Sequence, residues 1–152
     1  MERYVLGFIF DEARDHVLLS HKNRPSWQRG RLNGIGGKVE PNETPLGVMR
    51  RQCEEETNLS GLDWQHIATM VHGSSSITVF ATFTQAVFHA IRKMDEVLQI
   101  FPHRNLPERR ILPNLPVLIA LALDESGITK PVLLHNGVSS PEPNGCASKA
   151  VA

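Results

Sequence analysis

The order of apolar and polar residues in the first part of the chain predicts a β-hairpin followed by a long loop. Residues 3–10 and 16–21 are apolar and β-prone, and a short charged stretch separates them, which is typical of two antiparallel strands. Residues 23–37 are rich in Gly, Pro, Asn and Ser, so we expect an irregular segment there. Long irregular loops inside a compact domain usually carry a binding or active site.

A helix is predicted from Thr44 to about Asn58. Thr44 can cap its start, Pro45 suits the first helical position, and Asn58 can take the left-handed conformation that ends a helix. The positions expected to face the core recur at helical spacing: Leu46, Met49, Cys53 and Thr57. Gly47 costs a helix about 1 kcal/mol relative to Ala, so we expect packing or a close backbone contact to require it.

The remaining periodicity predicts three further strands and a second helix. Residues 64–71 and 76–87 are β-rich and joined by a turn, and 96–101 form a shorter strand that ends before a proline. Residues 115–124 are predicted to form a helix that is buried on most sides. Strands mixed with two helices indicate an α/β fold in which helices cover a sheet. We expect one domain over 1–138 and a disordered tail over 139–152, where Pro, Ser, Gly and Ala dominate.

Composition and charge narrow the class of protein. The chain has 152 residues, about one domain's worth, and its 16 basic residues balance 16 acidic ones. No overall charge therefore points to a nucleic-acid polymer or an anionic membrane as a partner. The two cysteines fit a reducing compartment, and no apolar run approaches the roughly 20 residues that cross a bilayer. We expect a cytoplasmic protein that is a monomer or a homodimer.

Acidic residues concentrate in the segment 37–59. Gln52, Glu55 and Glu56 are three and four positions apart, so they share one face of the predicted helix. Adjacent carboxylates repel each other unless a cation neutralises them, and Mg²⁺ prefers oxygen ligands of this kind. The alternative is a solvated helix face on which Arg50 and Arg51 balance the charge.

A glycine-rich stretch lies directly upstream of this helix. Glycines at 34, 36 and 37 permit close backbone approach, and Lys38 can add positive charge for a phosphate. The P-loop pattern is nevertheless absent, because Leu32 and Val39 occupy positions where it needs Gly and Ser or Thr. An ordinary turn is the alternative for this stretch.

Together these residues resemble the signature of the Nudix hydrolases. That signature has a glycine, five residues, Glu, seven residues and then Arg-Glu-x-x-Glu-Glu-x-Gly, with apolar positions between. The residues that match its spacing are Gly37, Glu43, Arg51, Glu55 and Glu56, with Cys53 and Leu59 at the apolar positions. Gln52 stands where the family usually has Glu, and Asn58 where it usually has Gly. The resemblance implies an α/β/α sandwich with a mixed sheet.

The resemblance also implies a metal site and a division of catalytic roles. Mg²⁺, with Mn²⁺ as an alternative, would be held by these residues: Gly37 through its carbonyl, Gln52, Glu55 and Glu56. Arg51 would orient Glu43 or Glu55, whereas a plain surface ion pair with Glu55 is the alternative. The general base would be Glu55, Glu56 or Glu96, which follows the central strands. The alternative role for Glu96 is a charge at a strand edge that prevents pairing with another strand.

The implied reaction is hydrolysis of a diphosphate linkage in a nucleotide. Residues 30–39 are similar to the matching segment of Nudix enzymes that sanitise oxidised purine nucleoside triphosphates, in which an Asn at the position of Asn33 contacts the base. A local backbone hydrogen bond is the alternative role for Asn33. The other substrate-binding candidates are Trp27 and Asn114 for the base and Arg31 and Lys38 for phosphate.

Three hypotheses about the function therefore remain open. The first is a nucleoside triphosphate pyrophosphohydrolase that releases the monophosphate and pyrophosphate. The second keeps this chemistry on ADP-ribose or another sugar nucleotide. The third is a nucleotide-binding module with weakened catalysis, because the neutral Gln52 amide brings no charge to a cation and cannot act as a base.

Overall fold

A mixed sheet forms the centre of the structure. The computed structural model describes residues 1–23, 28–90 and 97–136. Within them, eight strands form one sheet in the order β3-β2-β1-β6-β5-β8, with β4 paired to β1 and β7 paired to β2. The elements are β1 (Glu2–Phe10), β2 (His16–His21), β3 (Leu32–Asn33), β4 (Ile35–Val39), α1 (Pro45–Thr57), β5 (Gln65–His72), β6 (Ser75–Phe83), η2 (Gln85–His89), β7 (Leu98–Pro102), α2 (Leu115–Leu123) and β8 (Val132–Asn136).

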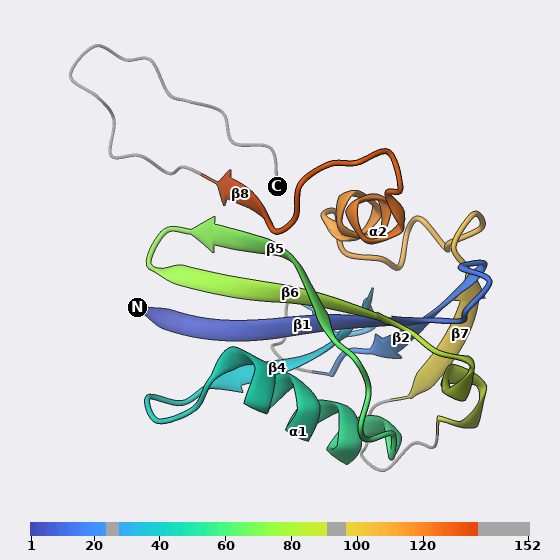
Figure 1. The fold of residues 1–152 in the computed structure, drawn as a ribbon, viewed down its shortest axis with the longest axis horizontal. Helices are drawn as coiled ribbons and strands as arrows, with labels where there is room; N and C mark the ends of the chain where they lie inside the picture. The colour runs from blue at the N-terminus through green and yellow to red at the C-terminus, as the bar shows by residue number, and fades with distance from the viewer. Residues whose placement is uncertain (24–27, 91–96, 137–152) are drawn as a thin grey trace.

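The two α-helices lie on opposite faces of this sheet (Figure 1). Strand β1 runs through the middle, antiparallel to β2 and β4 and parallel to β6. Its alternate side chains enter two separate cores: Val5 and Ile9 pack with α1, whereas Leu6, Phe8 and Phe10 pack with α2. The predicted α/β/α sandwich with a mixed sheet is confirmed.

The first hairpin and the first helix form where the sequence predicts them. In the hairpin turn, Oδ1 of the buried Asp11 accepts the backbone N–H groups of Asp15 and His16, each at 2.9 Å. In α1, the hydroxyl of Thr44 accepts the N–H of Gly47 at 3.2 Å, and Asn58 ends the helix with φ of 64°. A Cβ on Gly47 would lie 3.0 Å from that capping hydroxyl, which accounts for a glycine here.

The prediction of one long loop over 23–37 is wrong for its second half. Residues 32–33 and 35–39 are the strands β3 and β4, and β4 pairs with β1 over five residue pairs. Its glycines hide the usual alternation of apolar side chains, yet they allow the two backbones to approach closely. A Cβ on Gly36 would collide with the carbonyl oxygen of Val5.

Two other predicted elements have different limits. Strand β6 ends at Phe83, and Gln85–His89 form the short 3₁₀ helix η2. The hydroxyl of Thr84 accepts the N–H of Ala86 at 3.2 Å and so caps this turn instead of continuing the strand. The strand predicted over 96–101 is β7, Leu98–Pro102.

The second helix is buried on one face only, which corrects the prediction of burial on most sides. The face of α2 toward the sheet is buried through these residues: Leu115, Leu118, Ile119 and Ala122. Pro116, Val117 and Ala120 are exposed. One layer of sheet can cover only one side of a helix, whatever the composition of its other side.

The strand β8 was not predicted. It is short, follows Pro131, and gains its place by parallel pairing with β5. The predicted tail over 139–152 lies outside the described residues, and so does Glu96. In the part of the chain that the structure describes, no helix has the length and apolar character that crossing a membrane would require.

Candidate active site

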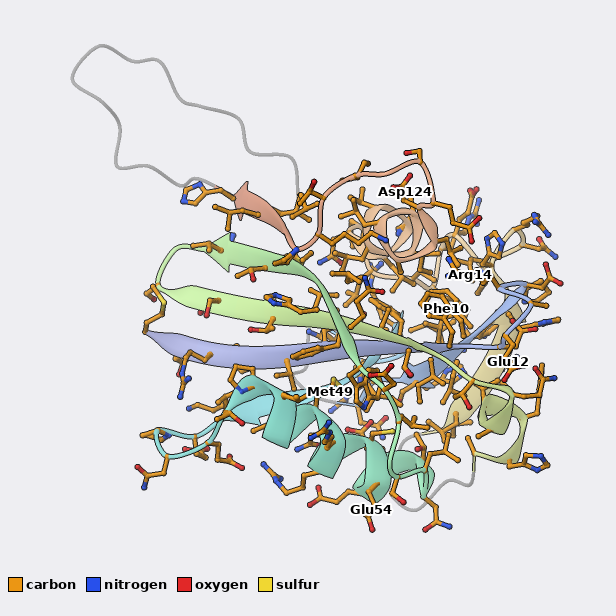
Figure 2. The ribbon with its side chains drawn as sticks, viewed as in Figure 1. Phe10, Glu12, Arg14, Met49, Glu54 and Asp124 are labelled. Atoms are coloured by element: carbon orange, nitrogen blue, oxygen red, sulfur yellow. The ribbon has the colours of Figure 1, made fainter. Side chains whose placement is uncertain are left out.

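The acidic run on α1 does not form one solvated face. Glu54 lies on the outer side of the helix, away from the sheet, whereas Met49 lies between the helix and the sheet (Figure 2). Glu55 is exposed, but Glu56 is only 7% exposed and lies on the sheet side with Met49 and Cys53. The register of α1 against β4 and β1 therefore turns one carboxylate of the run inward.

Arg51 holds two of the signature carboxylates at once. Its Nη2 donates to both oxygens of Glu43, at 2.9 Å and 3.2 Å, and its Nη1 lies 3.5 Å from Oε1 of Glu55. The hydrogen bond to Glu43 is the main reason that the pKa of Arg51 is raised. Both orienting partners considered in the sequence, Glu43 and Glu55, thus contact the same guanidinium, and one of these contacts is the ordinary i,i+4 pair.

The loop that carries Glu43 is held by several hydrogen bonds. Oε1 of Glu43 also accepts the N–H of Glu40 at 3.2 Å. Nη2 of Arg3 donates to the carbonyl oxygens of Glu40 and Glu43, at 3.2 Å and 3.5 Å. Sequence reasoning missed Arg3, because only the pairing of Arg3 with Val39 across β1 and β4 brings it to this loop.

Gln52 packs directly against Gly37. A Cβ on Gly37 would lie 2.5 Å from Nε2 and 2.7 Å from Cδ of Gln52. The glycine of the signature therefore provides the space in which the side chain at position 52 lies. This contact brings β4 and α1 together at the point where the sequence predicts the metal site.

Cys53 lies three residues before Glu56, on the same buried face of α1. Burial, and to a smaller extent the charges of Glu56 and Glu54, raise the pKa of the Cys53 thiol. Its Sγ lies 3.5 Å from the hydroxyl of Thr57. A thiol kept protonated is a poor nucleophile, so Cys53 belongs to the core, as the sequence indicates.

The oxygen-bearing side chains at and near Gln52 suit a hard cation, although they do not surround one. Within the described residues, no group of three or more His, Cys, Asp or Glu side chains is placed to hold a metal ion. The available groups are the Glu55 and Glu56 carboxylates, three and four residues from Gln52 on α1, and the Gln52 amide, which packs against Gly37. All are oxygen donors, and Mg²⁺ characteristically takes one or two carboxylates, keeps several waters and draws further oxygens from phosphate. The residues present fit such a partly hydrated ion.

The substrate candidates form a second group, next to β3. Leu32 forms a bridge with Ile111, which brings Arg31 and Asn33 beside the segment that leads to Asn114. Nη1 of Arg31 lies 3.5 Å from the carbonyl oxygen of Ile111. Oδ1 of the buried Asn33 accepts the N–H of Gly34 at 2.8 Å, so the local bond considered in the sequence is present and uses the amide oxygen.

The other substrate candidates lie elsewhere or outside the described residues. Nδ2 of Asn114 lies 3.7 Å from Sδ of Met70. Nζ of Lys38 lies 3.5 Å from Oε1 of Glu2, on the strand face opposite to that of Gly37, because neighbouring residues of β4 point to opposite faces. The structure therefore does not bring Lys38 to the Gln52 group. Trp27 and Glu96 fall in segments that the structure does not describe.

Comparison with solved structures places this fold among Nudix proteins. A structure from work on MutT of Aliivibrio salmonicida and Vibrio cholerae has a TM-score of 0.65 at 20% identity, over 81% of this chain and 97% of that one. A NUDIX-family hydrolase from Clostridium perfringens has a TM-score of 0.65 at 21% identity, covering 80% and 95%. DR0079 from Deinococcus radiodurans also has 0.65, at 20% identity, covering 81% and 83%.

At these identities the likeness to solved structures concerns the fold, and no curated protein sequence matches the chain. The family itself is defined by the sequence match. Residues 2–114 match the NUDIX domain, which includes both the helix α1 and the strands that support it. This chain therefore belongs to the Nudix hydrolase family.

Proposed function

We propose that this chain hydrolyses a nucleoside triphosphate, including oxidised purine forms, to the nucleoside monophosphate and pyrophosphate, with Mg²⁺ or Mn²⁺ as cofactor. The observation that carries the proposal is the contact of Arg51 with both Glu43 and Glu55, the residue directly before the buried Glu56. We propose that these carboxylates bind the cation that contacts the polyphosphate of the substrate. No nucleic-acid polymer is needed as a partner, and the chain acts as a monomer or a homodimer.

In this proposal Glu55, Glu56, the Gln52 amide and the Gly37 carbonyl are the groups that hold the cation. The cation, when bound, offsets negative charge on the phosphate oxygens. Arg51 keeps Glu55 in position through a guanidinium that Glu43 has already immobilised. The chain therefore supplies preorganised charge, which is the main protein contribution in phosphoryl transfer.

The reaction needs a water molecule and an acceptor for its proton. Water attacks phosphorus, the bridging P–O bond breaks, and pyrophosphate or the monophosphate leaves with the electron pair of that bond. The proton from water passes to a carboxylate, for which Glu55, Glu56 and Glu96 are the candidates.

The purine preference rests on Asn33 and its neighbours. The bond from Gly34 uses the amide oxygen of Asn33, so its N–H donors are the groups proposed for the base edge. Arg31 and Asn114 lie on the two segments joined by the bridge from Leu32 to Ile111 and are proposed to contact phosphate and base, respectively. Trp27 is proposed to stack on the base.

A nucleotide panel with product analysis tests the proposal. Ordinary and oxidised nucleoside triphosphates, ADP-ribose and other sugar nucleotides are incubated with the full chain and Mg²⁺ or Mn²⁺. We expect monophosphate and pyrophosphate from a purine triphosphate, and a loss of at least about 100-fold in kcat for Glu56→Gln. AMP and ribose 5-phosphate from ADP-ribose alone would favour the sugar-nucleotide reading.

Gln52 supports a second candidate function, a nucleotide-binding module with little turnover. The amide takes the place of a charged ligand beside Gly37. This candidate predicts measurable nucleotide binding, negligible product from every substrate in the panel, and a gain of activity in Gln52→Glu. Strong turnover by the wild type, unchanged in Gln52→Glu, would exclude it.

A further inference from the structure

Position 52 is the place where this chain differs in charge from the Nudix signature, and its surroundings are well defined. The Gln52 side chain is half-buried, and its amide end fills the space above Gly37. A glutamate there would bring a full negative charge to the same place. The amide brings only a dipole, and a dipole attracts a divalent cation much less strongly than a carboxylate does.

The carboxylates that remain are already partly neutralised. Glu55 contacts Arg51 at 3.5 Å, and Arg51 in turn contacts Glu43 at 2.9 Å. Arg51 with Glu43, Glu55 and Glu56 has one positive and three negative charges, so the formal sum is −2. Glu at position 52 would make this sum −3. The protein alone therefore offers a divalent cation two carboxylates, one of which it shares with a guanidinium.

We propose that Gln52 makes cation binding by this chain depend on bound nucleotide: the protein alone holds the cation weakly, and the phosphates of the nucleotide supply the charge that position 52 lacks. This inference rests on the proposed function, because it concerns the same cation and the same polyphosphate. It deepens that function by stating the order in which the components assemble.

Because of thermodynamic linkage, the coupling can be measured either through the affinity for the cation or through the affinity for the nucleotide. If bound nucleotide raises the affinity for the cation by some factor, the cation raises the affinity for nucleotide by the same factor. Restoring the missing charge in Gln52→Glu raises the cation affinity of the protein alone. Bound nucleotide then increases the cation affinity by less, so the coupling factor becomes smaller.

Equilibrium dialysis of Mn²⁺ against the full chain, with and without a nonhydrolysable nucleotide, tests the proposal. The probes are the α,β-methylene analogues of ATP and GTP, because their bridging carbon blocks cleavage between the first two phosphates. Three proteins are compared: wild type, Gln52→Glu and Gln85→Glu. Gln85 is exposed on η2, outside α1 and β4, so its variant adds the same charge elsewhere. Circular dichroism verifies that each variant is folded.

We expect the analogue to tighten Mn²⁺ binding by wild type on the order of tenfold or more. Gln52→Glu should bind Mn²⁺ at least about tenfold more tightly than wild type in the absence of analogue, and Gln85→Glu should match wild type. Titration calorimetry of the analogue, with and without Mn²⁺, should return the same coupling factor for each protein.

Two results would count against these statements in different ways. If wild type without analogue binds Mn²⁺ as tightly as Gln52→Glu does, the inference about Gln52 is overturned, while nucleotide hydrolysis in the substrate panel still supports the proposed function. If neither analogue binds in the presence of Mn²⁺ and no nucleotide in the panel is hydrolysed, the proposed function fails and the inference fails with it.

Discussion

Nη2 of Arg51 lies 2.9 Å from Oε2 of Glu43, eight residues earlier in the chain. Glu43 is in the loop between β4 and α1, and Arg51 is at the middle of α1, so the contact closes this loop onto the helix. The same guanidinium reaches Glu55 through Nη1. Arg51 thereby links the position of Glu55 to the conformation of the loop that carries Glu43.

Glu43→Gln should lower activity far more than stability. The Arg51 and Glu43 side chains are 42% and 31% exposed, and solvent-accessible pairs of this kind contribute about 1 kcal/mol or less to the free energy of unfolding. Loss of the Glu43 charge, however, leaves the Arg51 guanidinium and its partner Glu55 free to move. Loss of a residue that supports a metal ligand typically lowers activity about 10–100-fold. Steady-state kcat and the urea midpoint measure the two effects.

Asp15→Asn is the matched control for Glu43→Gln, because it breaks the exposed pair with Arg104. Equal activity losses in both variants would contradict the positioning role of Glu43.

Alanine at two neighbouring glycines should have opposite consequences. A Cβ on Gly36 meets the Val5 backbone, which cannot move without disturbing the sheet, so we expect Gly36→Ala to destabilise by about 1–3 kcal/mol. A Cβ on Gly37 meets the end of the Gln52 side chain, which can rotate away. Gly37→Ala should therefore stay folded within about 1 kcal/mol of wild type and lose nucleotide turnover. Thermal unfolding and the substrate panel distinguish the two; a larger loss of stability in Gly37→Ala than in Gly36→Ala would refute this reading of the contacts.

The second departure from the signature should be neutral for function. Asn58 adopts φ of 64° at the end of α1, a conformation that glycine accepts easily and alanine does not. We expect Asn58→Gly to change the free energy of unfolding by less than about 0.5 kcal/mol, and Asn58→Ala to lower it by about 1 kcal/mol. Turnover should be unchanged in both folded variants. A large gain of turnover in Asn58→Gly would show that this position limits catalysis.

Asp11 should contribute to the loss of stability in acid. Burial alone would raise the pKa of Asp11, but the backbone N–H groups of His16 and Asp15 and the ring of His16 outweigh it, so the pKa lies below its ordinary value. A carboxyl with a lowered folded-state pKa stabilises the protein above the unfolded-state pKa of about 4. That contribution is lost as the pH falls through the lower, folded-state pKa. Urea unfolding between pH 2.5 and 6 should show a smaller acid dependence for Asp11→Asn than for wild type, and identical curves would exclude this role.

Local sequence was sufficient for the elements whose signals are local. The capping hydroxyl of Thr44 and the left-handed Asn58 mark both ends of α1, and short apolar, β-prone runs mark β1 and β2. Helical spacing also predicted that Met49, Cys53 and Thr57 face the core, and all three are buried. The strands β3, β4 and β8 were missed because they are short or glycine-rich, and their pairing partners lie elsewhere in the chain.

What the sequence by itself determined is the set of residues: one glycine, one arginine and three glutamates at Nudix spacing, with a neutral amide at position 52. Only the tertiary structure decided how they meet. It turned Glu56 inward and Glu54 outward, joined Arg51 to two glutamates, placed Gln52 against Gly37 and directed Lys38 to Glu2. The reason is physical: helical periodicity fixes which side chains share a face, but the direction of that face depends on packing against strands that are distant in the sequence.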